Sequence, residues 1–143
     1  MSLCQAQDER MKLARAAESY VGAAFRLHGR DPVTGFDCVG LVLAAMAAIG
    51  RPVRLPLRYG LRNSDTQRFL RLATMAGFAE TAAPFEPGDV LVLKPGPGQL
   101  HLAVVVPGGV VHAHAGLRRV VHAPFPLCWP VAGQWRLALS APA

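Results

Sequence analysis

The sequence has few cysteines, few aromatic residues and no long apolar run. Its three cysteines, Cys4, Cys38 and Cys128, are an odd number without a close pair, which argues against a disulfide framework and indicates a reducing compartment. The apolar run Val39–Ile49 is about half of the ~20 residues that a membrane helix needs, so we expect no membrane span. The N-terminus lacks a basic start followed by an apolar stretch, so we expect synthesis in the cytoplasm without a signal peptide.

Acidic residues are also scarce. The chain has 9 Asp and Glu against 15 Lys and Arg, a formal net charge of +6. This surplus favours an anionic partner such as a cell-wall polymer, a nucleic acid, a membrane surface or an acidic protein. The basic residues are scattered, however, and few aromatic residues interleave with them, so we expect a generally basic surface and no nucleic-acid binding.

Length and composition indicate one globular domain. The 143 residues, of which 52% are hydrophobic, fit a single domain over 1–143 with its core at about 8–139. Apolar periodicity predicts a first helix from about Asp8 to Val21 and a second from Asp37 or Cys38 to Gly50. A third helix is expected at about Thr66–Ala76, after the capping residues Ser64 or Asp65.

After residue 84 the chain becomes rich in Val and Gly. This texture predicts strands at Asp89–Lys94, His101–Val106, Val110–Ala115, Arg118–Ala123 and about Gln134–Leu139. The short Gly- and Pro-containing segments between the strands imply antiparallel hairpins. Helices followed by an antiparallel sheet define an α+β fold, with the N-terminal helices packed on the C-terminal sheet.

Cys38 is the strongest candidate for a reactive group. It lies at the predicted start of the second helix, where free backbone N–H groups and the helix dipole favour thiolate over thiol. Gly40 leaves room beside it for a substrate backbone. The alternative is a buried structural cysteine, and Cys4 and Cys128 fit that description.

Two histidines on successive predicted strands supply a partner for this thiol. His101 begins one strand and could accept the thiol proton, while His112 on the next strand could lie beside it and orient its ring. If His101 and Cys38 form a thiolate–imidazolium pair, the thiol should still react fast at pH values well below ~8.5, the pKa of a free cysteine. Cys38, His101, His112 and His114 could also bind zinc, but they lack the short ligand spacings of zinc sites, so we expect no metal.

Four motifs in register resemble the NlpC/p60 family of cysteine peptidases. The segment Gly35–Val42 resembles the motif around the family's nucleophile, and Pro87–Leu91 resembles the start of the strand before its histidine. The segments His101–Val105 and Gly109–Ala113 resemble the strands with the catalytic histidine and the third polar residue. The resemblance extends over most of the chain, from about residue 14 to residue 114.

This resemblance implies a papain-like fold in which Cys38 is the nucleophile, His101 the general base and acid, and His112 the orienting residue. The implied substrates are peptidoglycan stem peptides, typically at the bond between γ-linked D-glutamate and a diamino acid. The resemblance implies no cofactor. The residues that we expect to contact the substrate are Phe25, His28, Asp37, Val39 and His114.

A narrower resemblance concerns the segment Phe25–Pro32, which is similar to the variant encoded among phage tail genes and in gene transfer agents. It implies an enzyme carried on the tail of a phage-like particle, with tail hub or tail-tip proteins as partners, that acts in the periplasm or cell wall. Phe25 replaces a tyrosine of many members, and Val39 replaces the usual serine. Phe25 leaves open a structural tail-tip component with a weakly active or inactive peptidase fold. An amidase or acyltransferase on the same scaffold also stays open, because all these enzymes use a Cys/His/His set and an acyl-thiol intermediate.

Overall fold

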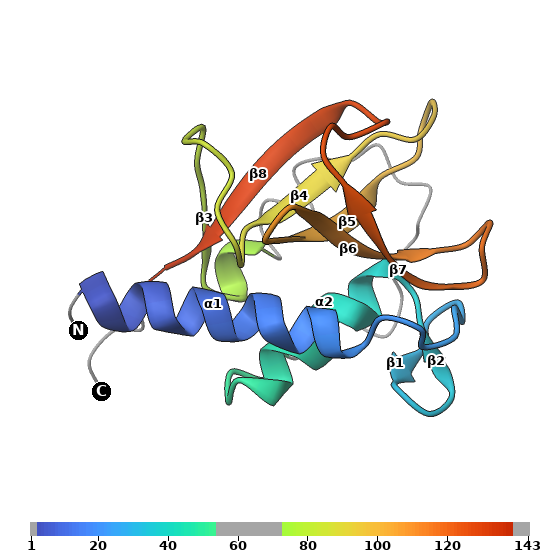
Figure 1. The fold of residues 1–143 in the computed structure, drawn as a ribbon, viewed down its shortest axis with the longest axis horizontal. Coiled ribbons are helices and arrows are strands. Elements are labelled where there is room, and N and C mark those ends of the chain that lie inside the picture. Colours follow the sequence, from blue (N-terminus) through green and yellow to red (C-terminus); the bar gives the residue numbers. More distant parts are fainter. Residues whose placement is uncertain (1–2, 54–72, 139–143) are drawn as a thin grey trace.

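Two helices lie on one side of a six-stranded antiparallel sheet in the computed structural model, which describes residues 3–53 and 73–138 (Figure 1). The strand order is β3-β8-β4-β5-β6-β7, and a separate two-stranded sheet joins β1 to β2. The predicted α+β class is confirmed. In chain order the elements are α1 (Leu3–Ser19), β1 (Arg30–Asp31), β2 (Gly35–Phe36), α2 (Cys38–Ala48), β3 (Phe78–Glu80), β4 (Val90–Leu93), β5 (His101–Val106), β6 (Gly109–His114), β7 (Arg119–Pro124) and β8 (Val131–Leu137).

Both helices bury their apolar side chains against each other and the sheet. In α1, Leu13, Ala14 and Ala17 are fully buried, although the helix begins five residues before the predicted start. Helix α2 begins at Cys38, as predicted, and is buried nearly all round its first two turns. The predicted third helix falls mostly outside the described residues; of its range, residues 73–75 are helical. In the described part of the chain, neither helix combines the length and the apolarity needed to cross a membrane.

The predicted hairpins of the sheet are confirmed. Strands β5, β6 and β7 pair in sequence, and β5 has the predicted bounds. Strand β8 begins three residues earlier than predicted and lies between β4 and β3. The short strands β1, β2 and β3 were not predicted, because two or three residues are too few to show an alternating pattern.

Both faces of the central strands are apolar. Val104 and Val111 face the helices, while Val105 and Val110 belong to a second apolar cluster on the other face. Successive residues of a strand point to opposite faces, so a continuous run of valines supplies apolar side chains to both faces of the sheet. The segment after β7 packs against the second cluster through Leu127 and Trp129. His101, His112 and His114 occupy the alternate strand positions that belong to this second face, and they lie at one end of the β5–β6 hairpin.

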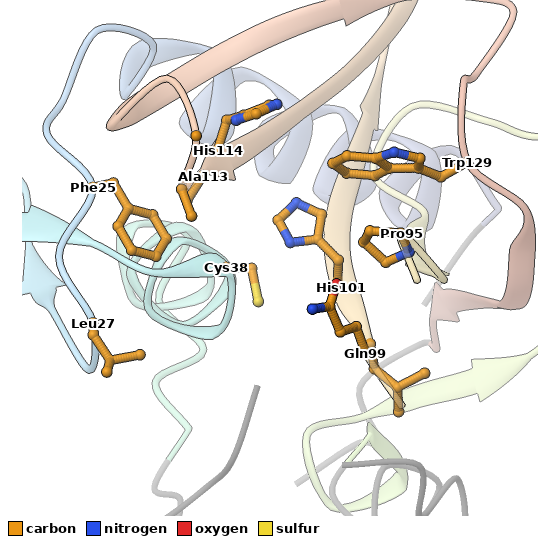
Figure 2. Close-up of a pocket in the computed structure, with 12 residues that line it drawn as sticks. Phe25, Leu27, Cys38, Pro95, Gln99, His101, Ala113, His114 and Trp129 are labelled. Carbon is orange, nitrogen blue, oxygen red and sulfur yellow. The ribbon is translucent and has the colours of Figure 1, made fainter. Parts of the chain in front are cut away.

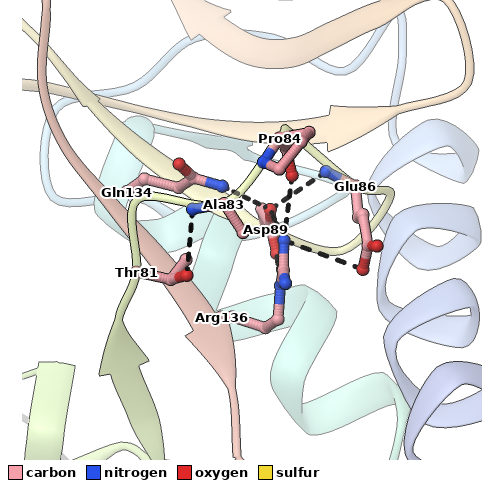
Figure 3. Close-up of polar contacts among 7 residues, drawn as sticks. All are labelled: Thr81, Ala83, Pro84, Glu86, Asp89, Gln134 and Arg136. Carbon is pink, nitrogen blue, oxygen red and sulfur yellow. Dashed lines mark hydrogen bonds and ion pairs between the residues drawn. The ribbon is translucent and has the colours of Figure 1, made fainter.

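A partly buried ion pair joins Arg136 of β8 to Asp89, the residue before β4 (Figure 3). Asp89 is fully buried, and its Oδ1 accepts a hydrogen bond from Nε of Arg136 at 2.9 Å. Its Oδ2 accepts from Nη2 of Arg136 at 2.9 Å, from Nε2 of Gln134 at 2.9 Å and from the backbone N–H of Glu86 at 3.0 Å. The hydrogen bond to Asp89 raises the pKa of Arg136. A fully buried carboxylate is thus satisfied by one cation and two neutral donors.

Arg136→Ala should lower the free energy of unfolding by about 3 kcal/mol, because it leaves the buried Asp89 carboxylate without its cation. Urea denaturation at neutral pH measures this loss. The matched control is Lys12→Ala, which removes an exposed ion pair with Asp8 and should change stability by less than about 1 kcal/mol. Equal losses in the two variants would contradict the structural role assigned to Asp89.

Candidate active site

The first turn of α2 is held by the carboxylate of Asp37. Its Oδ1 accepts a hydrogen bond from the backbone N–H of Gly40 at 2.7 Å, which caps the helix. Its Oδ2 accepts from the backbone N–H of His28 at 2.8 Å, so the same side chain ties the preceding loop to the helix. A Cβ atom at Gly40 would collide with the carbonyl oxygen of Gly29. Glycine at position 40 therefore lets the first turn of α2 pack directly against the loop at Gly29.

Cys38 opens onto a pocket at the end of the sheet (Figure 2). The pocket has a volume of about 420 Å³, within the usual range for small-molecule and peptide sites. The Cys38 side chain itself is 1% exposed. The pocket is lined by Phe25, Leu27, Cys38, Pro95, Gln99, Leu100, His101, Ala113, His114, Ala115, Gly116 and Trp129.

His101 and His112 are joined by a direct hydrogen bond. Nε2 of His101 lies 2.8 Å from Nδ1 of His112, and the ring planes are nearly perpendicular at 85°. His112 is buried with 5% exposure, whereas His101 is half-buried and lines the pocket. Figure 2 shows the His101 ring between Cys38 and Trp129. The structure therefore brings together the thiol and both histidines of the predicted triad.

His114 lines the same pocket and is held by the following turn. Its Nδ1 accepts a hydrogen bond from the backbone N–H of Leu117 at 3.1 Å. A Cβ atom at Gly116 would lie 3.0 Å from Cε1 of His114, so this glycine makes room for the ring. With Nδ1 acting as acceptor, neutral His114 carries its proton on Nε2.

Trp129 belongs to the site and was not anticipated. Its ring centroid lies 5.3 Å from that of His101, 5.7 Å from His112 and 5.9 Å from His114. In the sequence it lies in a short segment between two predicted strands, next to Pro130. A tryptophan in such a segment is a weak signal, because nothing local indicates which part of the sheet the segment covers.

Burial controls the protonation of the thiol. Desolvation raises the pKa of Cys38 from 9.0 to about 12, and the neighbouring charge of Asp37 acts in the same direction. Hydrogen bonds from backbone N–H groups, above all that of Leu102, oppose the rise but do not cancel it. The resting group is therefore a neutral thiol, and not the thiolate that its place at a helix start suggested.

Burial shifts the two histidines in the opposite direction. Desolvation lowers the pKa of His101 from 6.5 to about 3, with a further contribution from the charges of His112 and His114. It lowers the pKa of His112 to about 4, assisted by His114. Both imidazoles are therefore neutral at pH 7. These directions disfavour a thiolate–imidazolium pair in the resting site.

The residues expected to contact substrate divide into two groups. Phe25 and His114 line the pocket. Asp37, His28 and Val39 do not line it: Asp37 caps the helix, His28 is exposed and donates its backbone N–H to Asp37, and Val39 is 7% exposed in the core. Within residues 3–53 and 73–138, no group of three or more His, Cys, Asp or Glu side chains is arranged to hold a metal ion.

The fold is that of the NlpC/p60 proteins, as the sequence motifs predicted. NlpC2 from Trichomonas vaginalis superposes with a TM-score of 0.67 at 19% identity, over 92% of this chain and 47% of that chain. The peptidoglycan hydrolase RipB from Mycobacterium tuberculosis gives 0.63 at 21% identity, over 99% and 70%. The NlpC/p60 domain of the peptidoglycan hydrolase SagA gives 0.54 at 20% identity, over 91% and 98%. The chain spans less than half of NlpC2 and of NlpC1 from the same organism. No protein-family model and no curated protein matches the chain.

Alkylation of Cys38 should be slow at pH 7 and should rise continuously from pH 7 to pH 10, because burial keeps the thiol protonated. The measurement is the rate of iodoacetamide modification in a Cys4→Ser, Cys128→Ser background, where Cys38 is the remaining cysteine. The same protein unfolded in urea provides the control and should titrate as an ordinary thiol. A rate that has already reached a plateau at pH 7 would contradict this prediction and support a resting thiolate–imidazolium pair.

Stability should fall as the pH drops below about 6.5. The unfolded chain binds protons at His101 and His112 there, whereas the lowered pKa values keep both folded side chains neutral. Each group contributes up to about 1.4 kcal/mol per pH unit between pH 6.5 and its own folded pKa. Urea denaturation at pH 7 and pH 5 should show a smaller loss for His112→Gln than for wild type. The control, His122→Gln at an exposed position, should lose as much as wild type.

Proposed function

We propose that the protein is a cysteine peptidase that hydrolyses peptidoglycan stem peptides. The observation that carries this proposal is the His101–His112 hydrogen bond of 2.8 Å, at a pocket that the thiol of Cys38 also lines. A nucleophile, a base and a group that orients the base are the parts needed for acyl transfer through a thioester. The pocket beside them can hold the substrate.

The hydrogen bond between the histidines determines the tautomer that catalysis requires. Nε2 of His101 is engaged with His112, so Nδ1 is the nitrogen left to take the thiol proton. Nδ1 must then be unprotonated, and the proton of neutral His101 lies on Nε2, which donates to Nδ1 of His112. In the opposite arrangement His112 would donate, and His101 could not act as a base toward Cys38.

The neutral resting state defines the first step. As Sγ of Cys38 attacks the scissile carbonyl carbon, its proton passes to Nδ1 of His101, and the carbonyl oxygen becomes an oxyanion. The backbone N–H of Cys38, at the start of α2, is one donor for that oxyanion. His101 then returns the proton to the leaving amine as the C–N bond breaks. Water hydrolyses the thioester with His101 again acting as base.

The proposed scissile bond joins γ-linked D-glutamate to a diamino acid. Support comes from the four sequence motifs and from the fold, since RipB and SagA are both peptidoglycan hydrolases. Phe25 and His114 are the predicted substrate contacts that line the pocket. Because Phe25 has no hydroxyl, it can offer this substrate apolar packing but no hydrogen bond.

We further propose that a phage-like or gene-transfer-agent tail carries the enzyme to the cell wall, with a tail hub or tail-tip protein as its partner. The segment at residues 25–32 supports this, through its resemblance to tail-associated members. An inactive tail-tip component is the second candidate, favoured by the missing hydroxyl at Phe25. An amidase or acyltransferase would use the same three residues and release different fragments.

Digestion of purified muropeptides is the direct test. Wild type should release fragments cut between D-glutamate and the diamino acid, and Cys38→Ala should reduce the rate at least 10³-fold because it removes the nucleophile. Cys128→Ala, at an exposed cysteine, is the matched control and should keep wild-type activity. Mass spectrometry of the fragments separates a peptidase from an amidase. Absence of cleavage by wild type would favour the tail-tip component.

A further inference from the structure

The segment between β7 and β8 carries Trp129 over the two bonded histidines. The indole packs on the second apolar cluster of the sheet, which includes Ala103 and Val110. These residues belong to β5 and β6, the strands that also carry His101 and His112. The indole therefore has apolar contacts of its own in addition to its ring contacts with the histidines.

The ring geometry around Trp129 is specific. The indole plane is at 87° to the ring of His101 and at 79° to that of His112, an edge-to-face arrangement with both. The two imidazoles are themselves at 85° with centroids 5.0 Å apart. Three mutually perpendicular rings leave each imidazole little freedom to rotate. Such aromatic contacts favour one orientation in addition to burying surface.

Shielding has an electrostatic consequence for the hydrogen bond. A hydrogen bond is stronger in a low-dielectric surrounding than in water, and it stays aligned when water cannot compete for either nitrogen. His101 is half-buried and faces an open pocket, so it needs a cover on the remaining side. Figure 2 shows Trp129 on the side of the His101 ring opposite Cys38.

We propose that Trp129 is a positioning residue that covers the hydrogen bond between His101 and His112 and holds the His101 ring in its orientation toward Cys38. The role acts through the histidine pair and involves no bond to the substrate. It rests on the proposed function only for its effect on turnover. Its effect on the histidines is a property of the free protein and can be measured without substrate.

Titration of the histidines by NMR is the primary test, in wild type, Trp129→Leu, Trp129→Phe and the control Trp135→Phe. The titratable groups that face His101 are Cys38 from α2 and His112 and His114 from β6, while Leu93 of β4 opposite it is apolar. Burial lowers the pKa of both bonded histidines. Removal of the indole should admit water and raise their midpoints by about one pH unit or more toward 6.5.

The conservative variants separate positioning from bulk packing. Trp129→Phe keeps an aromatic ring over the pair and should restore midpoints close to those of wild type. Trp135→Phe removes the other tryptophan, in the core of β8, and should leave the midpoints unchanged. Folded Trp129→Leu protein with wild-type midpoints would overturn the proposal.

If Trp129→Leu does not fold, the fluorescence difference between wild type and Trp129→Phe reports on Trp129. The fluorescence of Trp129 should be quenched as the histidines become protonated. A Trp129 fluorescence that does not change over this titration would also overturn the proposal.

Turnover gives a second readout on the same variants. Trp129→Leu should lower kcat about tenfold because it disturbs the base. Although Trp129 also lines the pocket, leucine keeps that part of the lining apolar, so KM should change by less than about twofold. A raised KM with unchanged kcat would identify Trp129 as a substrate contact and overturn the positioning role. Failure of wild type to cleave muropeptides would reject the proposed function alone, because the titration shifts would still be observed.

Discussion

The carboxylate of Asp37 is the interaction on which the site depends. It is fully buried and accepts hydrogen bonds from backbone N–H groups on both sides, from His28 in the loop and from Gly40 in the helix. Bonds of this kind to a carboxylate are strong and directional. They fix the start of α2 against the loop that precedes it, and Cys38 is the next residue in the chain. The position of the thiol is thus determined by a residue that does not line the pocket.

Burial then decides the chemistry of the resting site. A helix start favours a thiolate, and the backbone N–H groups around Cys38 do lower its pKa, but desolvation outweighs them. The same desolvation keeps His101 and His112 neutral. A neutral thiol beside a neutral imidazole stores no ion pair, so in the proposed mechanism charge develops only when a substrate is attacked. When both groups rest neutral, the orientation of the histidine ring matters as well as its basicity, and we assign that orientation to His112 and Trp129.

The sheet supports this arrangement from both sides. Its central strands have two apolar faces, one against the helices and one against the segment that carries Trp129. The Asp89–Arg136 pair links β8 to the start of β4, and β4 pairs directly with β5. The fold is shared with NlpC/p60 proteins at about 20% identity, a level at which packing is retained although most side chains differ.

Local patterns in the sequence determined much of the fold and the candidates for chemistry. Helical periodicity located α2 and its first residue, and alternating valines between glycine and proline breaks located β5 with its histidine. These features depend on neighbours within a few residues, so a single sequence contains them. The structure alone decided that Trp129 lies beside the bonded histidines and that burial keeps the thiol protonated. Each of these depends on groups distant in the chain, on the burial they create and on the register between β5 and β6, and none of those quantities is local.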